Sequence, residues 1–166
     1  MAGQRVPTTQ VDVLTAIVKQ LQTALGLTES ACFLSVHPEA QPTVNQNVWL
    51  TVSPEDGQFD DGAWGGGGQA VLIENTWAVI TIFSAMRLDR PEHDVAFLTD
   101  VVRGVLTVKR KVLKALGTFD PVNSSADFIL CQPMAPTNSP RPLNDRLRIG
   151  DCQLWFSTIF LWDIES

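Results

Sequence analysis

The chain has few of the residues and runs that secreted proteins, membrane proteins and most enzymes use. It contains 166 residues, with two histidines and three cysteines. No apolar run reaches the ~18–20 residues that a membrane-spanning helix needs. The first ten residues, MAGQRVPTTQ, contain no apolar core of a signal peptide. We therefore expect a protein that is made in a cytoplasm and does not bind a membrane.

The cysteines do not form a recognisable redox or metal pattern. Cys32, Cys131 and Cys152 are far apart in the sequence and lie in apolar, strand-like runs without a C-x-x-C pair. Such cysteines behave as small buried hydrophobic residues in a reducing compartment. The sequence predicts three buried free thiols.

Catalytic motifs are missing as well. The sequence has no G-x-S-x-G nucleophile elbow, no G-x-x-x-x-G-K-[ST] phosphate loop and no H-E-x-x-H zinc pattern. His37 precedes a proline in a connector, and His93 falls in the first turn of a helix, so a structural role is expected for both. We expect no enzyme activity, no catalytic residue and no cofactor.

The loop over residues 53–68 is rich in acidic residues and glycine. Glu55, Asp56, Asp60 and Asp61 could hold a hard cation, but their spacing does not match a calcium loop. The glycine run 65–68 leads into a strand, whereas a phosphate cradle needs a helix N-terminus behind it. We therefore expect a solvated acidic loop without a metal, or a negative rim if the protein forms a ring.

The overall composition is that of one globular domain. Hydrophobic residues make up 45% and charged residues 18% of the chain, which is typical of a protein with a packed core. The net charge of −6 and the pI of about 4.7 argue against nucleic-acid binding as the main function. We expect a flexible arm over residues 1–8 and a single domain over residues 9–166.

A long strand and a long helix organise this domain. Residues 69–84 are rich in β-branched and aromatic residues, which predicts a strand. Residues 91–116 predict a helix, with Asp89 as its cap, Pro91 in the first turn and Gly117 at its end. Its apolar residues recur at helical spacing: Val95, Leu98, Val101, Val102, Val105, Val108, Val112, Leu113 and Leu116.

The remaining elements are expected to pack against these two. An amphipathic helix is predicted from Thr9 to Leu25, where Gly26 ends it. Short strands are predicted over residues 31–36, 48–52 and 126–132, an irregular proline-rich loop over residues 133–142, and a central strand over residues 147–164. The fold class is α+β: a mostly antiparallel sheet with two main helices packed on one face.

Residues 48–84 predict a long β-hairpin that projects from the domain. Sixteen residues of strand, 69–84, span ~50 Å at ~3.3 Å each, which is longer than a compact domain of this size is across. A projecting hairpin needs a partner to cover its edges. A second copy of the chain is the simplest such partner.

Eight residues are the candidates for subunit or partner contacts. Trp64, at the glycine-rich tip of the hairpin, has no core of its own to enter, and insertion into a pocket of a neighbour is expected. The basic residues of the long helix suit its C-terminal dipole and its solvated face, or an acidic partner surface such as a sister subunit. The full set is Phe59, Trp64, Trp77, Arg103, Lys109, Arg110, Lys111 and Lys114.

The order of the elements resembles that of the tail terminator proteins of long-tailed bacteriophages. The resemblance rests on the helix TQVDVLTAIVKQLQTAL, the hairpin VWLTVSPEDG…QAVLIENTWAVITIFSAMRLD, the helix DRPEHDVAFLTDVVRGVLTVKRKVL and the closing strand QLWFSTIFLWD. It covers residues 9–164. The loop 53–68 is longer than is usual in that family, and the loop 133–142 contains more proline.

The resemblance implies a structural virion protein rather than an enzyme. It implies a ring, commonly of six subunits, that caps the head-proximal end of the tail tube and joins it to the head–tail connector in the neck. The partners would be further copies of the chain, tail tube protein and connector protein, with DNA passing through the lumen unbound. Assembly in the host cytoplasm and location in the virion tail are implied. The alternatives are another neck component and a small cytoplasmic ligand- or peptide-binding module.

Overall fold

The fold is of the α+β class, with three helices and a mixed sheet among the described residues. The computed structural model describes residues 10–60, 71–86, 90–117, 119, 128–134, 141–144 and 149–163. The expected arm over residues 1–8, and Trp64 with the rest of the hairpin tip, lie outside these ranges.

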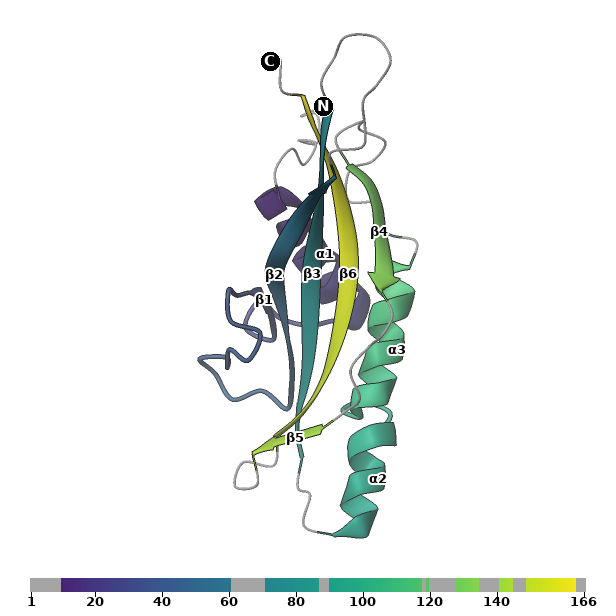
Figure 1. The fold of residues 1–166 in the computed structure, drawn as a ribbon. Coiled ribbons are helices and arrows are strands. Elements are labelled where there is room, and N and C mark those ends of the chain that lie inside the picture. Colours follow the sequence, from purple (N-terminus) through teal and green to yellow (C-terminus); the bar gives the residue numbers. More distant parts are fainter. Residues whose placement is uncertain are drawn as a thin grey trace.

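The sheet is built around the two strands β3 and β6 (Figure 1). The strands are β1 (Cys32–Leu34), β2 (Val48–Asp60), β3 (Val71–Ala85), β4 (Phe128–Met134), β5 (Arg141–Asn144) and β6 (Ile149–Asp163). Their order is β1-β2-β3-β6-β4, and β5 also pairs with β6. β1 and β2 are parallel, whereas every other pair in this order is antiparallel. The closing strand is therefore central in the sheet, as its sequence predicts.

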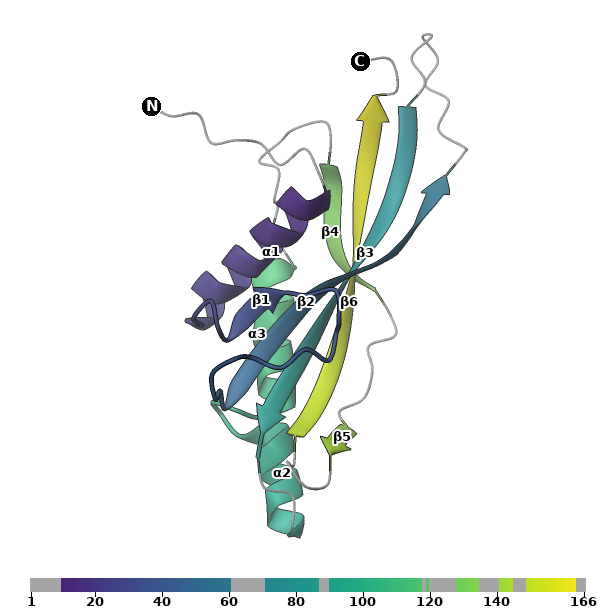
Figure 2. The same cartoon turned by 90° about the vertical axis from the view of Figure 1, so that its left-hand side faces the viewer.

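The core joins α1 (Gln10–Leu25) and α3 (Val105–Leu116) to β1, β2 and β3. Alternate strand residues enter it because neighbouring side chains in a strand point to opposite faces. The buried core side chains are Val13, Leu14, Ile17, Val18, Leu21, Cys32, Leu50, Val52, Ala78, Ile80, Ile82, Phe97, Val105, Val108, Val112 and Leu116. Figure 2 shows α1 and α3 beside the sheet from a second direction.

The connector between β1 and β2 is bonded to two alternate residues at the start of β2, Trp49 and Thr51. The rings of Trp49 and Phe83 stack, with centroids 4.9 Å apart. The indole N–H of Trp49 donates a hydrogen bond to the carbonyl oxygen of Ala40 at 3.2 Å. The hydroxyl of Thr51 donates to the carbonyl oxygen of Pro38 at 2.6 Å. Two side chains of β2 therefore hold the backbone of this connector.

One prediction about the helix ends needs correction. α1 begins at Gln10 and ends as expected before Gly26, which has a positive φ of 67°. The helix after the hairpin does begin with Pro91, but its N-cap is Arg90, without a side-chain cap, and not Asp89, which lies outside the described residues. Gly117 ends α3 as predicted.

The predicted loop over residues 53–68 is wrong for its first half. β2 continues to Asp60 and pairs with β3 except at Asp56 and Gly57, where the register shifts between Glu55 and Gln58. Pairing with a long partner outweighs the low strand propensity of Pro54 and Gly57, since the strand preference of a residue depends strongly on its context. The bulge absorbs the irregularity.

The proline-rich stretch 133–142 is also less irregular than predicted. Pro133 and Met134 end β4, whereas Arg141 and Pro142 begin β5. Both prolines pair with β6, opposite Phe156 and Gly150. In this sheet order β4 and β5 pair with β6 alone among the described strands, and such edge positions accept proline.

The most consequential correction concerns the long helix predicted over residues 91–116. It consists of two helices, α2 (Pro91–Thr99) and α3 (Val105–Leu116). The turn between them, residues 100–104, is called the elbow. Its geometry determines the candidate site.

Candidate subunit-interaction surface

The carboxylate of Asp100 holds the elbow in shape. It accepts hydrogen bonds from the backbone N–H of Val102 at 2.9 Å and of Arg103 at 2.7 Å. Both bonds lower the pKa of Asp100 from its ordinary value, and the bond from Arg103 has the larger effect. The carboxylate thus satisfies two N–H groups just before α3, as a helix cap does.

Gly104 allows the chain to close at the elbow. A Cβ at this position would lie 2.5 Å from the backbone nitrogen of Asp100 and 2.6 Å from its carbonyl oxygen. The N–H of Gly104 donates to that carbonyl oxygen at 3.0 Å. Any larger residue would push the backbone at position 104 away from that of Asp100.

The break exposes apolar residues that a continuous helix would bury. The predicted apolar face, made of the apolar residues at helical spacing, enters the core within α3. Val105, Val108, Val112 and Leu116 are buried there. Before α3, Leu98 is half-buried against the core, whereas Val95, Val101 and Val102 are 62%, 78% and 67% exposed. The elbow resets the helical phase, so these valines do not share the face of α3 that enters the core. Leu106, in the first turn of α3, is 40% exposed.

The basic residues predicted as contacts lie in the elbow and along α3. Arg103 lies in the elbow and is half-buried, as is Lys109 in α3. Arg110, Lys111 and Lys114 are exposed along α3. The ammonium group of Lys111 donates to the carbonyl oxygen of Val101 at 3.4 Å, which ties α3 back to the elbow.

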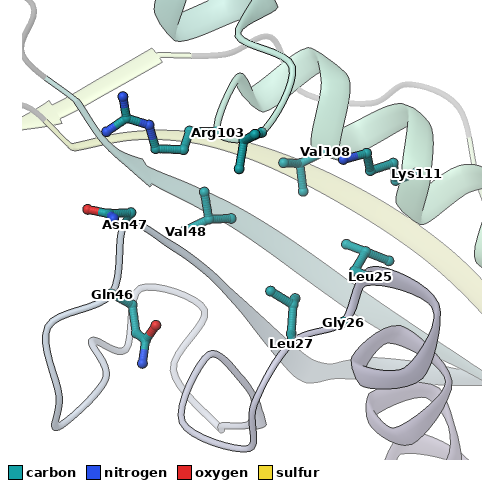
Figure 3. Close-up of a pocket in the computed structure, with 10 residues that line it drawn as sticks. Leu25, Gly26, Leu27, Gln46, Asn47, Val48, Arg103, Val108 and Lys111 are labelled. Atoms are coloured by element: carbon teal, nitrogen blue, oxygen red, sulfur yellow. The ribbon is translucent and has the colours of Figure 1, made fainter.

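Two of these cations, Arg103 and Lys111, line a hollow of about 340 Å³ (Figure 3). Its lining comes from the end of α1, the connector before β2, the start of β2, the elbow and α3. The residues are Leu25, Gly26, Leu27, Gln46, Asn47, Val48, Val102, Arg103, Val108 and Lys111. Arg110 and Lys114 are not among them. Arg103 and Lys111 therefore both line the hollow, at opposite ends of its helix side, whereas Arg110 and Lys114 do not line it.

The hollow combines apolar walls with cationic and amide side chains. In Figure 3 the side chains of Leu25, Leu27, Val48 and Val108 line the space between the helices and β2. Arg103 and Lys111 lie on the side of the elbow and α3, and the amides of Gln46 and Asn47 lie on the connector side. Sequence reasoning missed the apolar and amide members, because no local pattern links segments so far apart in the chain.

The aromatic candidates lie elsewhere. Phe59 is in the distal part of β2, opposite Glu74 of β3. Trp77 is in β3, where it pairs with Glu55 on one side and Ser157 of β6 on the other. Trp64 lies outside the described residues, and the side chains of Phe59 and Trp77 do as well.

The remaining titratable residues offer little chemistry. Cys32 is a free, buried thiol whose pKa is raised to about 12 by burial, so it is not a nucleophile at neutral pH. The backbone of Cys131 lies in β4 and that of Cys152 in β6. His37 is exposed, and His93 is half-buried in α2. Across the described ranges no three His, Cys, Asp or Glu side chains are grouped to hold a metal ion.

The comparisons with known proteins leave the family open. No protein-family model matches this chain, and no curated protein matches it either. Within the part of the chain that the structure describes, no helix is long and apolar enough to cross a membrane.

Proposed function

We propose that the chain is a structural virion protein, a ring-forming tail terminator of a long-tailed bacteriophage. It would cap the head-proximal end of the tail tube and present a second face to the connector in the neck. The observation that carries the proposal is the long antiparallel pair of β2 and β3, of 13 and 15 residues. Strands of globular domains usually have ~5–6 residues.

In this proposal the distal part of the hairpin is an arm that projects toward a neighbouring subunit, and the helices cover one face of the sheet. β1 pairs only with residues Leu50 to Val52 of β2. Of the described strands, none pairs with the same edge of β2 beyond Val52. An open edge of this kind needs a cover, and a subunit of a ring supplies one.

The charge of the chain supports the same proposal. A net charge of −6 would let DNA pass through a lumen without the phosphate contacts that hold it on basic proteins. Virion location follows from the proposed function. Another head–tail neck component would share the ring and the charge but would not stop tube growth.

The test is capping of growing tail tubes. Purified protein is added to tail tube protein of the same phage during polymerisation, and tube length is measured by negative-stain electron microscopy. We expect tubes of limited length that carry a ring at one end, and a native mass of six subunits for the ring. Tubes of unchanged length without rings would contradict the proposal.

A second candidate, a ligand-binding module, is favoured by the hollow at the elbow. Its volume of about 340 Å³ falls in the range of small-ligand sites. A module of this kind would remain a monomer or dimer and would leave tube growth unchanged. The native mass and the capping assay therefore separate the two candidates.

A further inference from the structure

We propose that the hollow at the elbow receives the acidic segment of β2, residues 55–60, from a second copy of the chain. This inference rests on the proposed function, because it assumes self-association, and it names the two surfaces that meet. It combines three observations, which concern the hollow, its surroundings and the location of the segment.

The chemistry of the hollow fits an acidic chain that carries an apolar group. Leu25, Leu27, Val48 and Val108 would accept the apolar group, and Arg103 and Lys111 would face its carboxylates. From Val101 to Leu116 the sequence contains five basic residues and no acidic one. A partner of negative charge is therefore favoured over a neutral or basic one.

The surface beside the hollow is apolar and exposed. Val102 lines the hollow and is 67% exposed, and the adjacent Val101 is 78% exposed. Exposed apolar residues next to a hollow are typical of protein contact sites rather than of solvated helix ends. The elbow is held by backbone hydrogen bonds that the carboxylate of Asp100 accepts, so it is already formed before a partner arrives.

The chain contains a segment of the complementary kind. Residues 55–60 read EDGQFD, with Glu55, Asp56 and Asp60 as acids and Phe59 as the apolar group. They belong to β2 but lie at the far end of the strand from Val48, which lines the hollow. Twelve residue steps along β2 separate Val48 from Asp60, which is about 40 Å.

Figures 1 and 2 show the same separation, since the distal ends of β2 and β3 lie at one end of the molecule and α2 lies at the other. The segment of one copy cannot reach its own hollow. A contact between unlike surfaces of identical copies is heterologous, and it propagates into a closed ring or an open filament. The proposed pairing thus supplies the kind of contact that a terminator ring requires.

Charge exchange tests the pairing. One variant carries Arg103→Glu and Lys111→Glu, a second carries Asp56→Lys and Asp60→Lys, and a third carries all four substitutions. A matched control reverses two other exposed cations, Lys19→Glu and Arg90→Glu. Self-association is measured by sedimentation velocity over a concentration series at low and physiological salt, and folding is checked by circular dichroism.

We expect each of the first two variants to lose at least about tenfold in association constant, since close charge pairs across an interface are strongly coupled. The four-substitution variant should regain association, which a merely misfolded protein would not do. The control should associate as the unsubstituted chain does.

Three results would overturn the inference. If rings form equally well from all variants, the hollow is not the contact, although the tail terminator proposal stands. If the unsubstituted chain remains a monomer at every concentration, the two surfaces do not bind each other, and the capping assay decides the terminator proposal separately. Loss of tube binding with unchanged self-association would assign the hollow to a different acidic protein and would likewise refute the pairing.

Discussion

The core around β2 and the elbow between α2 and α3 are stabilised in different ways. Leu50 and Val52 of β2 are fully buried among side chains of α1, α3 and β3, which are distant in the sequence. The elbow is held by the carboxylate of Asp100 and by the close approach at Gly104, both within residues 100–104. The core therefore depends on long-range apolar burial, whereas the elbow depends on local hydrogen bonds.

The apolar side chains of the core stabilise the fold, whereas those of the elbow stay exposed and can contact a partner. Val52 and Val102 are the same residue type, yet Val52 is 0% and Val102 is 67% exposed. Burial of a valine side chain contributes ~1.5–3 kcal/mol, and Val102 contributes little of this in the isolated chain. An apolar side chain that is exposed in the folded chain can still contribute its burial free energy when a partner covers it.

The largest expected effect comes from truncating the core. Leu50→Ala should lower the free energy of unfolding by about 2–5 kcal/mol, because the surrounding side chains cannot fill the space left. Val102→Ala should change it by less than about 0.5 kcal/mol, as is usual for exposed positions. Urea unfolding monitored by tryptophan fluorescence measures both. Equal losses for the two variants would show that the elbow is part of the folding core.

A smaller loss of stability is expected from adding a side chain at Gly104, where the backbone of the elbow approaches itself closely. Gly104→Ala places a Cβ against the backbone of Asp100, and overpacking of this kind costs about 1–3 kcal/mol. The amides of Val102 and Arg103 should then exchange with solvent faster, because the turn must open. The matched control is Gly26→Ala, where the positive φ strains the new residue but nothing lies within 4 Å of its Cβ.

The control should lose some stability without changing the exchange of the elbow amides. If Gly104→Ala leaves those amides as slow as in the unsubstituted chain, the close approach does not determine the shape of the elbow.

The elements that the sequence predicts well are those with local signals. Pro91 at the start of α2, Gly117 after α3 and the β-branched run of β3 are read from neighbouring residues alone. The α+β class follows from such elements taken together. The elbow was missed because the apolar periodicity continues across it at Val101 and Val102. An Asp four residues before a Gly, at 100 and 104, is the signal that could have indicated the break.

The hollow could not be predicted in the same way. Leu25, Asn47, Val48 and Lys111 meet only after α1, the connector, β2 and α3 have packed. Of the predicted contact residues, Arg103 and Lys111 line the hollow, and the sequence alone gives no reason to separate them from Arg110 and Lys114. The membership of a site that gathers distant segments depends on packing, which local patterns do not encode.

The smallest expected effect tests the charge at the elbow. Asp100→Asn keeps an oxygen that can accept the two backbone hydrogen bonds but removes the negative charge. Because the pKa of Asp100 is lowered in the folded chain, its charged form stabilises the fold. This contribution is complete above the pKa of the unfolded chain, ~3.9 for an ordinary Asp, and it is lost as the pH falls through the lower folded value. Thermal unfolding at pH 7 should therefore show a slightly lower midpoint for the Asn variant, and the two midpoints should converge in strong acid. A difference that persists unchanged at acid pH would mean that the carboxylate acts through its shape and not through its charge.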